Sequence, residues 1–310
     1  MAAAPRSTES RSVCVIVNPA AGGGRGDGAA EGLRELFAKH GARIDVAMAR
    51  ASDDVKAIAR RAVERGDALL VVAGGDGTLA AAASVLSGTP TALGIIPIGT
   101  FNHFAKDVGI PMDPSAAAQA ALGGGRRAVD VGEVNGQMFI NNSSVGLYPR
   151  LVWERQRRQE QGRRKISALA GAAFTVWRRY RRVTVRLRLL DGGTRTLTVR
   201  TPFVFVGNNV YQLSGLAFGS RARLDRGRLH ICMAPELSAS GMVGVLGNAL
   251  VGRLASFEQF DSREVTTVTI EAWRPRLGVA LDGEVAVLRT PLRYRIRPGA
   301  LRVAVPAVHE

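Results

Sequence analysis

Cysteine is scarce in this sequence: only Cys14 and Cys232 occur among its 310 residues. Two thiols so far apart exclude a disulfide framework and give no spacing typical of a zinc site. Each lies in a short apolar run typical of a buried strand. We therefore expect both to pack as small core residues, in a protein of the reducing cytoplasm.

Long apolar runs are also missing. The longest weakly polar stretches, 168–177 and 241–252, fall short of the about 20 residues that a helix needs to cross a bilayer. Residues 1–11 are polar and small, without the apolar segment of a signal peptide, and they predict a disordered tail. We expect a cytoplasmic protein that can meet a membrane only at its surface.

Acidic residues are too few to balance the basic ones: 26 Asp and Glu against 42 Lys and Arg leave a net charge of +16. This excess favours an acidic partner, and the candidates are nucleic acid, anionic lipid and phosphate-bearing ligands. Aromatic residues make up only 5%, and no zinc, helix-turn-helix or RNA-recognition pattern occurs, so we expect no nucleic acid.

The first part of the chain alternates between strand-like and helix-like segments. Short, continuous apolar runs predict strands buried on both faces, and the alternation predicts a parallel sheet in a three-layer α/β domain. We place this domain at residues 12–128, with segment 297–310 as a candidate to complete it. The expected strands are 13–17, 43–49, 68–73 and 92–97, and the expected helices are 28–40, 52–65 and 78–86.

From residue 129 onwards the pattern is mostly β. Asn135-Gly136 and Asp191-Gly192 each separate two strand-like runs, which is the strongest short signal for a hairpin. Residues 129–296 therefore predict a β-sandwich domain, with one basic helical excursion at 151–182. Further strands are expected at 203–207, 229–233, 265–272, 277–281 and 292–296.

Three loops in the first domain follow predicted strands, where a doubly wound sheet binds its ligands. The first begins with Asn18-Pro19 and continues through Gly22, Gly23 and Gly24. Successive glycines next to the start of a helix expose N–H groups that suit a phosphate. A flexible turn is the alternative interpretation of this loop.

The second loop directly follows a buried strand and reads Gly74-Gly75-Asp76-Gly77-Thr78. Its glycines allow a sharp turn that points the carboxylate of Asp76 outwards. A carboxylate there can hold Mg²⁺ or accept a proton from a hydroxyl group, and a helix N-cap is the alternative. The third loop offers Thr100 and Asn102, small side chains suited to phosphate, ribose or the positioning of a carboxylate.

The motifs NPAAGGGRG at 18–26, GGDGT at 74–78 and PIGTFNHFA at 97–105 resemble those of the diacylglycerol kinase catalytic domain family. This family includes bacterial soluble lipid kinases and sphingosine kinases. GGDG alone is shared with NAD kinases and 6-phosphofructokinases. The resemblance continues with NNSSVG at 141–146 and LDGE at 281–284, and these two motifs favour the lipid-kinase branch.

This resemblance implies a two-domain kinase that binds ATP and Mg²⁺ and transfers the γ-phosphoryl group to the hydroxyl of diacylglycerol or a related lipid. It implies Glu284 as the general base, with Asp76 acting through Mg²⁺ or as the base itself. Asp130 and Asp225 become candidate metal ligands by the same resemblance. An NAD kinase-like enzyme and a catalytically inactive lipid-binding regulator are the alternatives.

Several positions depart from the pattern of the family. His103 stands where an aspartate is usual, which removes one carboxylate from the expected Mg²⁺ network. Ala80 and Ala81 replace a common Asn-Glu pair. Arg226 stands where many bacterial members have the acidic residue of a structural Mg²⁺ loop. These departures keep the inactive alternative open and weaken the expectation of a structural metal.

The basic excursion spaces its apolar residues three and four apart, which is typical of an amphipathic helix. Arginine near an anionic surface contributes roughly 1 kcal/mol per residue, so we expect this segment to hold the protein peripherally on a membrane. A solvated face that packs on the β domain is the alternative, and exposed strand edges allow a homodimer. The expected membrane-facing residues are Arg155, Arg157, Arg158, Arg163, Arg164 and Lys165.

Overall fold

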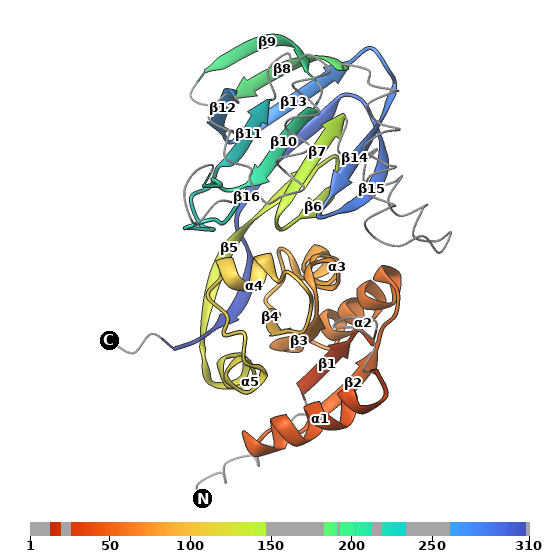
Figure 1. Ribbon diagram of the computed structural model, residues 1–310, viewed down its shortest axis with the longest axis vertical. Helices are drawn as coiled ribbons and strands as arrows, with labels where there is room; N and C mark the ends of the chain where they lie inside the picture. The colour runs from red at the N-terminus through yellow and green to blue at the C-terminus, as the bar shows by residue number, and fades with distance from the viewer. Residues whose placement is uncertain are drawn as a thin grey trace, which may run out of the picture. The chain divides into compact units, whose positions relative to one another are not determined.

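In the computed structural model the chain divides into two compact units (Figure 1). The α/β unit comprises residues 1–129 and 300–310, and the β unit comprises residues 130–299. The expected tail, Gly22 to Gly24 and the basic excursion lie outside the residues that the structure describes. The described residues are 13–19, 26–146, 183–190, 193–201, 203–212, 219–233 and 261–307.

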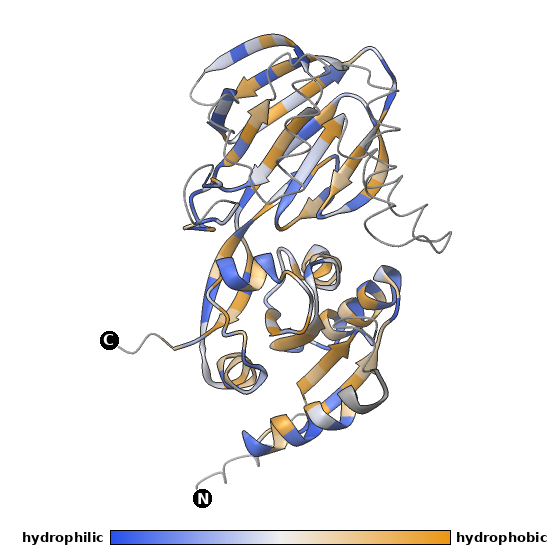
Figure 2. Ribbon diagram, viewed as in Figure 1, coloured by the Kyte–Doolittle hydropathy of each residue, from blue (hydrophilic) through white to orange (hydrophobic). Residues whose placement is uncertain are grey.

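A parallel sheet forms the centre of the α/β unit, with the strand order β2-β1-β3-β4 followed by the end of β16. β3 and β4 are buried along their whole length, as their continuous apolar sequences predict. Figure 2 shows this apolar character along the strands of the unit. The bounds are β1 Val13–Val17, β2 Ile44–Met48, β3 Leu69–Gly74, β4 Ala92–Pro97 and β16 Leu292–Val305.

Five helices accompany this sheet in the described residues. Three of them match the expected helices to within two residues: α1 (Gly26–Lys39), α2 (Ser52–Glu64) and α3 (Asp76–Leu86). α4 (His103–Asp107) and α5 (Pro114–Gly123) were not expected. α5 begins where the carboxylate of Asp113 accepts a hydrogen bond from the backbone N–H of Ala116 at 2.8 Å. Among the described helices, none has the length and apolar character needed to span a membrane.

Two antiparallel sheets form the β unit. One has six strands in the order β12-β11-β10-β7-β14-β15. The other contains β16, β13, β8 and β9, with β5 beside β16 and β6 beside β5. The bounds are β5 Gly125–Val134, β6 Gln137–Phe139, β7 Asn142–Gly146, β8 Val183–Leu190, β9 Thr194–Thr201, β10 Phe203–Asn208, β11 Leu229–Met233, β12 Asp261–Val265, β13 Thr267–Ala272, β14 Arg276–Leu281 and β15 Glu284–Arg289.

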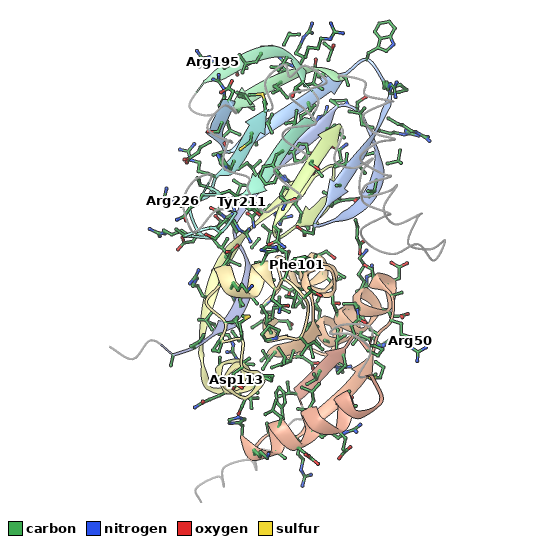
Figure 3. All side chains as sticks on the ribbon, viewed as in Figure 1. Arg50, Phe101, Asp113, Arg195, Tyr211 and Arg226 are labelled. Atoms are coloured by element: carbon green, nitrogen blue, oxygen red, sulfur yellow. The ribbon has the colours of Figure 1, made fainter. Side chains whose placement is uncertain are left out.

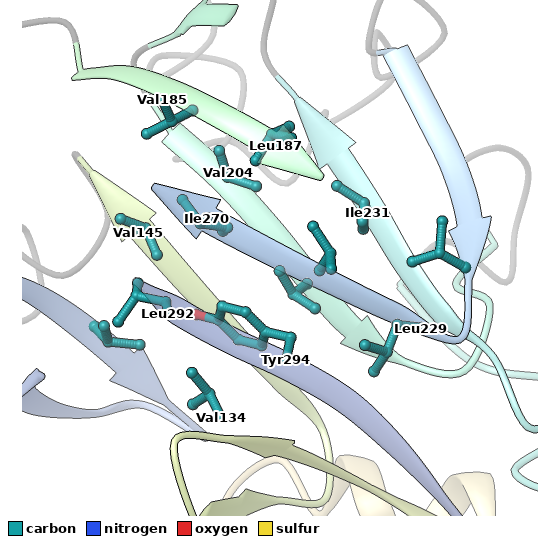
Figure 4. Close-up of a cluster of buried hydrophobic side chains, with 14 of the residues drawn as sticks. Val134, Val145, Val185, Leu187, Val204, Leu229, Ile231, Ile270, Leu292 and Tyr294 are labelled. Carbon is teal, nitrogen blue, oxygen red and sulfur yellow. The ribbon is translucent and has the colours of Figure 1, made fainter. Parts of the chain in front are cut away.

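Alternate residues of the two sheets point towards each other and form one core (Figure 4). Val204 and Ile231 from the first sheet and Ile270 and Leu187 from the second belong to this cluster. Tyr294 is the largest side chain in it, and its hydroxyl forms a hydrogen bond with the hydroxyl of Ser143 at 3.0 Å. A β-sandwich core of this kind is what the alternating sequence predicts.

The hairpin signal at Asn135-Gly136 is confirmed. Both residues have a positive φ, 48° and 83°, and they connect β5 to β6 as a two-residue turn. The single strand expected at 265–272 is wrong, because the chain breaks at Thr266. β12 ends before it in the six-stranded sheet and β13 begins after it in the other sheet, so this residue is where the chain crosses the sandwich.

Candidate functional site

The carboxyl edge of the parallel sheet brings the predicted loops together. Val17, Ala73 and Ile96 lie in register on three neighbouring strands, so the loops that follow them start at the same level. Nδ2 of Asn18 donates a hydrogen bond to Oγ1 of Thr78 at 3.0 Å, which joins the loop after β1 to the start of α3. Asn18 and the GGDGT turn are therefore neighbours, although 60 residues separate them in sequence.

The glycines at this edge allow two loops to pack closely. A Cβ atom on Gly99 would lie 2.4 Å from the Cα atom of Gly75, which is too close for any side chain at position 99. A Cβ atom on Gly74 would lie 2.7 Å from the Cβ of Thr78. Glycine is therefore required at position 99 by the contact between the two loops, and at position 74 by the contact with the start of α3.

The carboxylate of Asp76 connects the same two loops. Its Oδ1 accepts the backbone N–H of Phe104 at 3.0 Å, and its Oδ2 accepts that of His103 at 3.2 Å. These amides belong to the start of α4, where N–H groups lack a partner within the helix. Asp76 thus caps a helix 27 residues away in sequence rather than its own turn, and each oxygen still has a lone pair for another ligand.

The loop after β4 closes on itself through Asn102. The Oδ1 of Asn102 accepts the N–H of Gly99 at 3.0 Å, and its Nδ2 donates to the carbonyl of the same residue at 2.9 Å. Asn102 is buried and has a left-handed φ of 53°, so its side chain shapes the loop, whereas Thr100 is exposed. The ring of His103 stacks on that of Phe101, with centroids 5.6 Å apart, and Phe101 is 62% exposed (Figure 3).

In the β unit, Glu284 begins β15 directly after the turn that Asp282 starts. The backbone at 282–283 has φ values of 47° and 90°, as in a two-residue hairpin. The carboxylate of Asp282 accepts three consecutive backbone N–H groups, those of residues 140–142, at 2.8, 2.8 and 3.0 Å. The turn is therefore fixed to the NNSSVG motif, while the side chain of Glu284 remains exposed.

Burial raises the pKa of Asp282 to about 6, although the three amides and the charge of Arg221 act in the opposite direction. The residue as a whole is half-buried, and Gly283 beside it in the turn is exposed. The carboxylate itself is enclosed, so loss of water around it outweighs the hydrogen bonds that favour its charged form.

A buried arginine supports the segment that holds this turn. Arg221 is 3% exposed, and its guanidinium donates to the carbonyls of Ile140 at 2.7 Å and Asn208 at 3.0 Å and to Oδ1 of Asn141 at 2.7 Å. The guanidinium carbon also lies 5.2 Å from the centre of the Tyr211 ring, which is within cation–π range. Charge, hydrogen bonds and packing together fix residues 140 and 141.

The two candidate metal ligands in the β unit are already engaged by other groups. Both oxygens of Asp130 accept backbone N–H groups, from Gly227 at 2.7 Å and Gly299 at 2.8 Å, and the residue is buried. Asp225 forms a surface ion pair with Arg223 at 2.8 Å. In the described part of the chain, no three acidic, histidine or cysteine side chains gather into a metal site.

Two family descriptions match the chain one after the other. The diacylglycerol kinase catalytic domain matches residues 12–134, and the YegS C-terminal NAD kinase beta sandwich-like domain matches residues 154–305. A Pseudomonas aeruginosa protein named "Probable lipid kinase YegS-like" is 34% identical over 258 residues, which cover 82% of each chain. This chain belongs to the diacylglycerol kinase family.

Other relatives extend the likeness over nearly the whole chain. A Mycobacterium tuberculosis protein named "Diacylglycerol kinase" is 28% identical over 308 residues, or 97% of both chains. The crystal structure of a diacylglycerol kinase from Bacillus anthracis has a TM-score of 0.70 at 22% identity, and covers 96% of this chain and 98% of that one. This structural likeness confirms the predicted fold class, an α/β domain followed by a β-sandwich domain.

Sequence reasoning found the motifs of the diacylglycerol kinase family but missed the residues that support them. Arg221, Asn208 and Asp282 form the framework around the DGE turn, and only Asp282 lies within a recognised motif. Asn208 is fully buried and donates to the carbonyls of Asp130 and Ile140 at 2.8 and 2.9 Å. The adjacent pair Asn208-Asn209 after an apolar strand was the only signal in the sequence for this framework.

Proposed function

We propose that this member of the diacylglycerol kinase family is an ATP-dependent lipid kinase. It transfers the γ-phosphoryl group of ATP to the hydroxyl of diacylglycerol or a related lipid at a membrane surface. The observation that carries the proposal is the fixed DGE turn: three backbone N–H groups hold Asp282 and thereby set the position of Glu284. Positioned carboxylates of this kind suit general-base catalysis.

The nucleotide phosphates would bind at the carboxyl edge of the parallel sheet. The first N–H groups of α3, from Asp76 to Thr78, have no partner within the helix, and helix N-termini bind anions. The close packing of Gly75 on Gly99 lets a phosphate approach the backbone without side chains in the way. Asn18, Pro19, Gly74, Gly77, Thr100 and the glycines at 22–24 complete the proposed contacts, and Asn102 contributes by shaping the loop.

The residues present are compatible with Mg²⁺ bound largely through the nucleotide. Mg²⁺ commonly binds to one or two carboxylates together with phosphates and water, and Asp76 offers the remaining lone pair of each oxygen. Bound there, Mg²⁺ would neutralise charge on the phosphates. Asp130 offers less, because the whole residue is buried, whereas Asp76 is only half-buried.

Glu284 would take the proton from the lipid hydroxyl as that oxygen attacks the phosphorus. Its exposed position at the start of β15 leaves the carboxylate open to a substrate. General-base help contributes about 10²–10⁴-fold in rate, so Glu284→Gln should lower kcat by that order and leave the KM for ATP nearly unchanged. The isosteric change keeps the turn intact because Asp282, not Glu284, holds it.

Labelled ATP, Mg²⁺ and mixed micelles of single candidate lipids test this proposal. Transfer to one lipid class by the wild-type protein, lost in Glu284→Gln and kept in Glu264→Gln, supports it and names the acceptor class. Glu264 is an exposed glutamate on β12, so its replacement is a matched control. Phosphorylation of NAD would instead favour the NAD kinase-like alternative. Binding to anionic vesicles without any transfer would favour the inactive regulator.

A further inference from the structure

One sheet of the β unit presents an exposed face covered with arginine. Ile270, Leu187 and Leu292 point into the core, so the residues next to them on β13, β8 and β16 point to the opposite face. Register places Arg293, Thr269, Arg188 and Thr196 side by side across four strands. We call this surface the arginine face, and its arginines are Arg186, Arg188, Arg200, Arg293, Arg295 and Arg297.

The acidic residues near this face are too few to neutralise it. Glu271 lies between Arg186 and Arg188, at 3.8 and 3.9 Å, and these weak pairs leave both arginine side chains more than half exposed. Glu133 is buried and accepts from Arg295 at 2.8 Å and from Arg297 at 3.2 Å. Among the described residues, six arginines thus meet two glutamates on one face of the sheet.

A tryptophan lies at the end of this face. Trp273 directly follows β13, continues the outward alternation of Thr269 and Glu271, and is 98% exposed. Its turn is held in place, because the N–H of Thr290 donates to the carbonyl of Pro275 at 3.0 Å and its hydroxyl to that of Arg274 at 2.8 Å. Tryptophan is enriched where proteins meet the headgroup level of a bilayer, since its ring is apolar and its N–H is polar.

We propose that the arginine face and Trp273 dock on an anionic lipid surface. The charge selects an acidic partner and excludes a second copy of the same face, because two positive surfaces repel each other. One exposed aromatic ring at the end of this face favours a lipid headgroup layer over nucleic acid, which uses several stacked rings. This surface is distinct from the basic excursion at 151–182, and its test needs neither ATP nor turnover.

Sedimentation with phosphatidylcholine vesicles, with and without phosphatidylglycerol, measures the electrostatic contribution to vesicle binding. The triple change Arg186→Gln, Arg188→Gln and Arg293→Gln should weaken binding to the anionic vesicles about a hundredfold, since each arginine contributes about a fivefold factor. The control removes the same number of charges from the α/β unit: Lys39→Gln, Arg60→Gln and Arg61→Gln, all exposed. It should change binding by less than about threefold, because these charges are not part of the arginine face and salt screens charges outside the contact.

Fluorescence tests the place of contact. The chain has three tryptophans, so replacing Trp153 and Trp177 by phenylalanine leaves Trp273 as the only reporter. Its emission should shift to the blue on anionic vesicles and be quenched by brominated acyl chains.

Two results would overturn the proposal. In the first, the protein binds anionic vesicles, but the emission of Trp273 does not change and both triple variants lose the same amount of vesicle binding. In the second, the triple arginine variant binds vesicles as the wild type does and loses binding only to a single-stranded oligonucleotide. This result would assign the arginine face to nucleic acid.

Discussion

Arg221 offers the sharpest test of how the DGE turn is held. Within the described part of the chain, replacing it by alanine removes the hydrogen bonds of a charged donor to Ile140, Asn208 and Asn141, at a position where the arginine is 3% exposed. Each bond to a charged group contributes about 1.5–3 kcal/mol, and one acceptor, the carbonyl of Ile140, keeps a second donor in Asn208. The freed burial cost of the guanidinium offsets part of this loss.

We therefore expect Arg221→Ala to lower the free energy of unfolding of the β unit by about 3 kcal/mol. Lysine should retain part of this stability, because one ammonium keeps the charge but cannot reach all three acceptors. Urea unfolding followed by tryptophan fluorescence measures the effect, since all three tryptophans fall within residues 130–299.

Arg223 provides a matched control two residues away. It is 61% exposed and pairs with Asp225 on the surface, so its replacement by alanine should cost less than about 1 kcal/mol. Equal small effects of Arg221→Ala and Arg223→Ala on the free energy of unfolding, within about 0.5 kcal/mol of each other, would contradict this role of Arg221. Loss of lipid kinase activity in Arg221→Ala should appear in kcat more than in the KM for ATP, because the arginine supports the turn of Glu284.

Three further predictions follow from the packing and the pKa shifts. Gly99→Ala should destabilise the α/β unit by about 1–3 kcal/mol and weaken ATP binding measured by calorimetry, because its Cβ atom would lie 2.4 Å from the Cα atom of Gly75. Gly123→Ala is the control: no atom lies within 4 Å of the added Cβ, so neither stability nor ATP binding should change. Burial raises the pKa of Asp282 from 3.8 to about 6, so between these pH values the native state binds a proton that the unfolded chain does not bind. The free energy of unfolding of the wild type, relative to that of Asp282→Asn, should therefore increase by about 1 kcal/mol from pH 7 to pH 5. A difference that stays constant with pH would contradict the raised pKa. Burial raises the pKa of Cys232 to about 12, so its thiol should react with a disulfide reagent at pH 8 only after unfolding, and rapid native labelling would contradict this burial.

The sequence predicts the regular part of the fold well because its signals are local. Continuous apolar runs identify β3 and β4, and the pair Asn135-Gly136 identifies a hairpin whose two residues need a positive φ. The sequence did not predict α5, because the faces of this alanine-rich helix differ little in polarity. Its main sequence signal is the N-cap residue Asp113. Such a helix depends on packing in the folded chain more than on its own pattern.

The candidate site was predictable in its motifs but not in its contacts. The glycines around Asp76 indicated a sharp turn, yet nothing local shows that the carboxylate binds amides 27 and 28 residues later. Arg221 looked like any other arginine in a very basic chain, and only the fold shows that it is buried. Asp130 is a candidate metal ligand by resemblance, and nothing local in the sequence indicates its two backbone partners, Gly227 and Gly299.

The most direct test of the central claim is single-turnover transfer of labelled phosphate from ATP to lipid by the purified chain. We expect a labelled lipid with the wild-type protein and with Glu264→Gln, and a rate lower by about 10²–10⁴-fold with Glu284→Gln. Equal rates for the wild type and Glu284→Gln would contradict the assignment of the base. No labelled lipid with any variant, from a protein that still binds ATP, would contradict the kinase proposal itself.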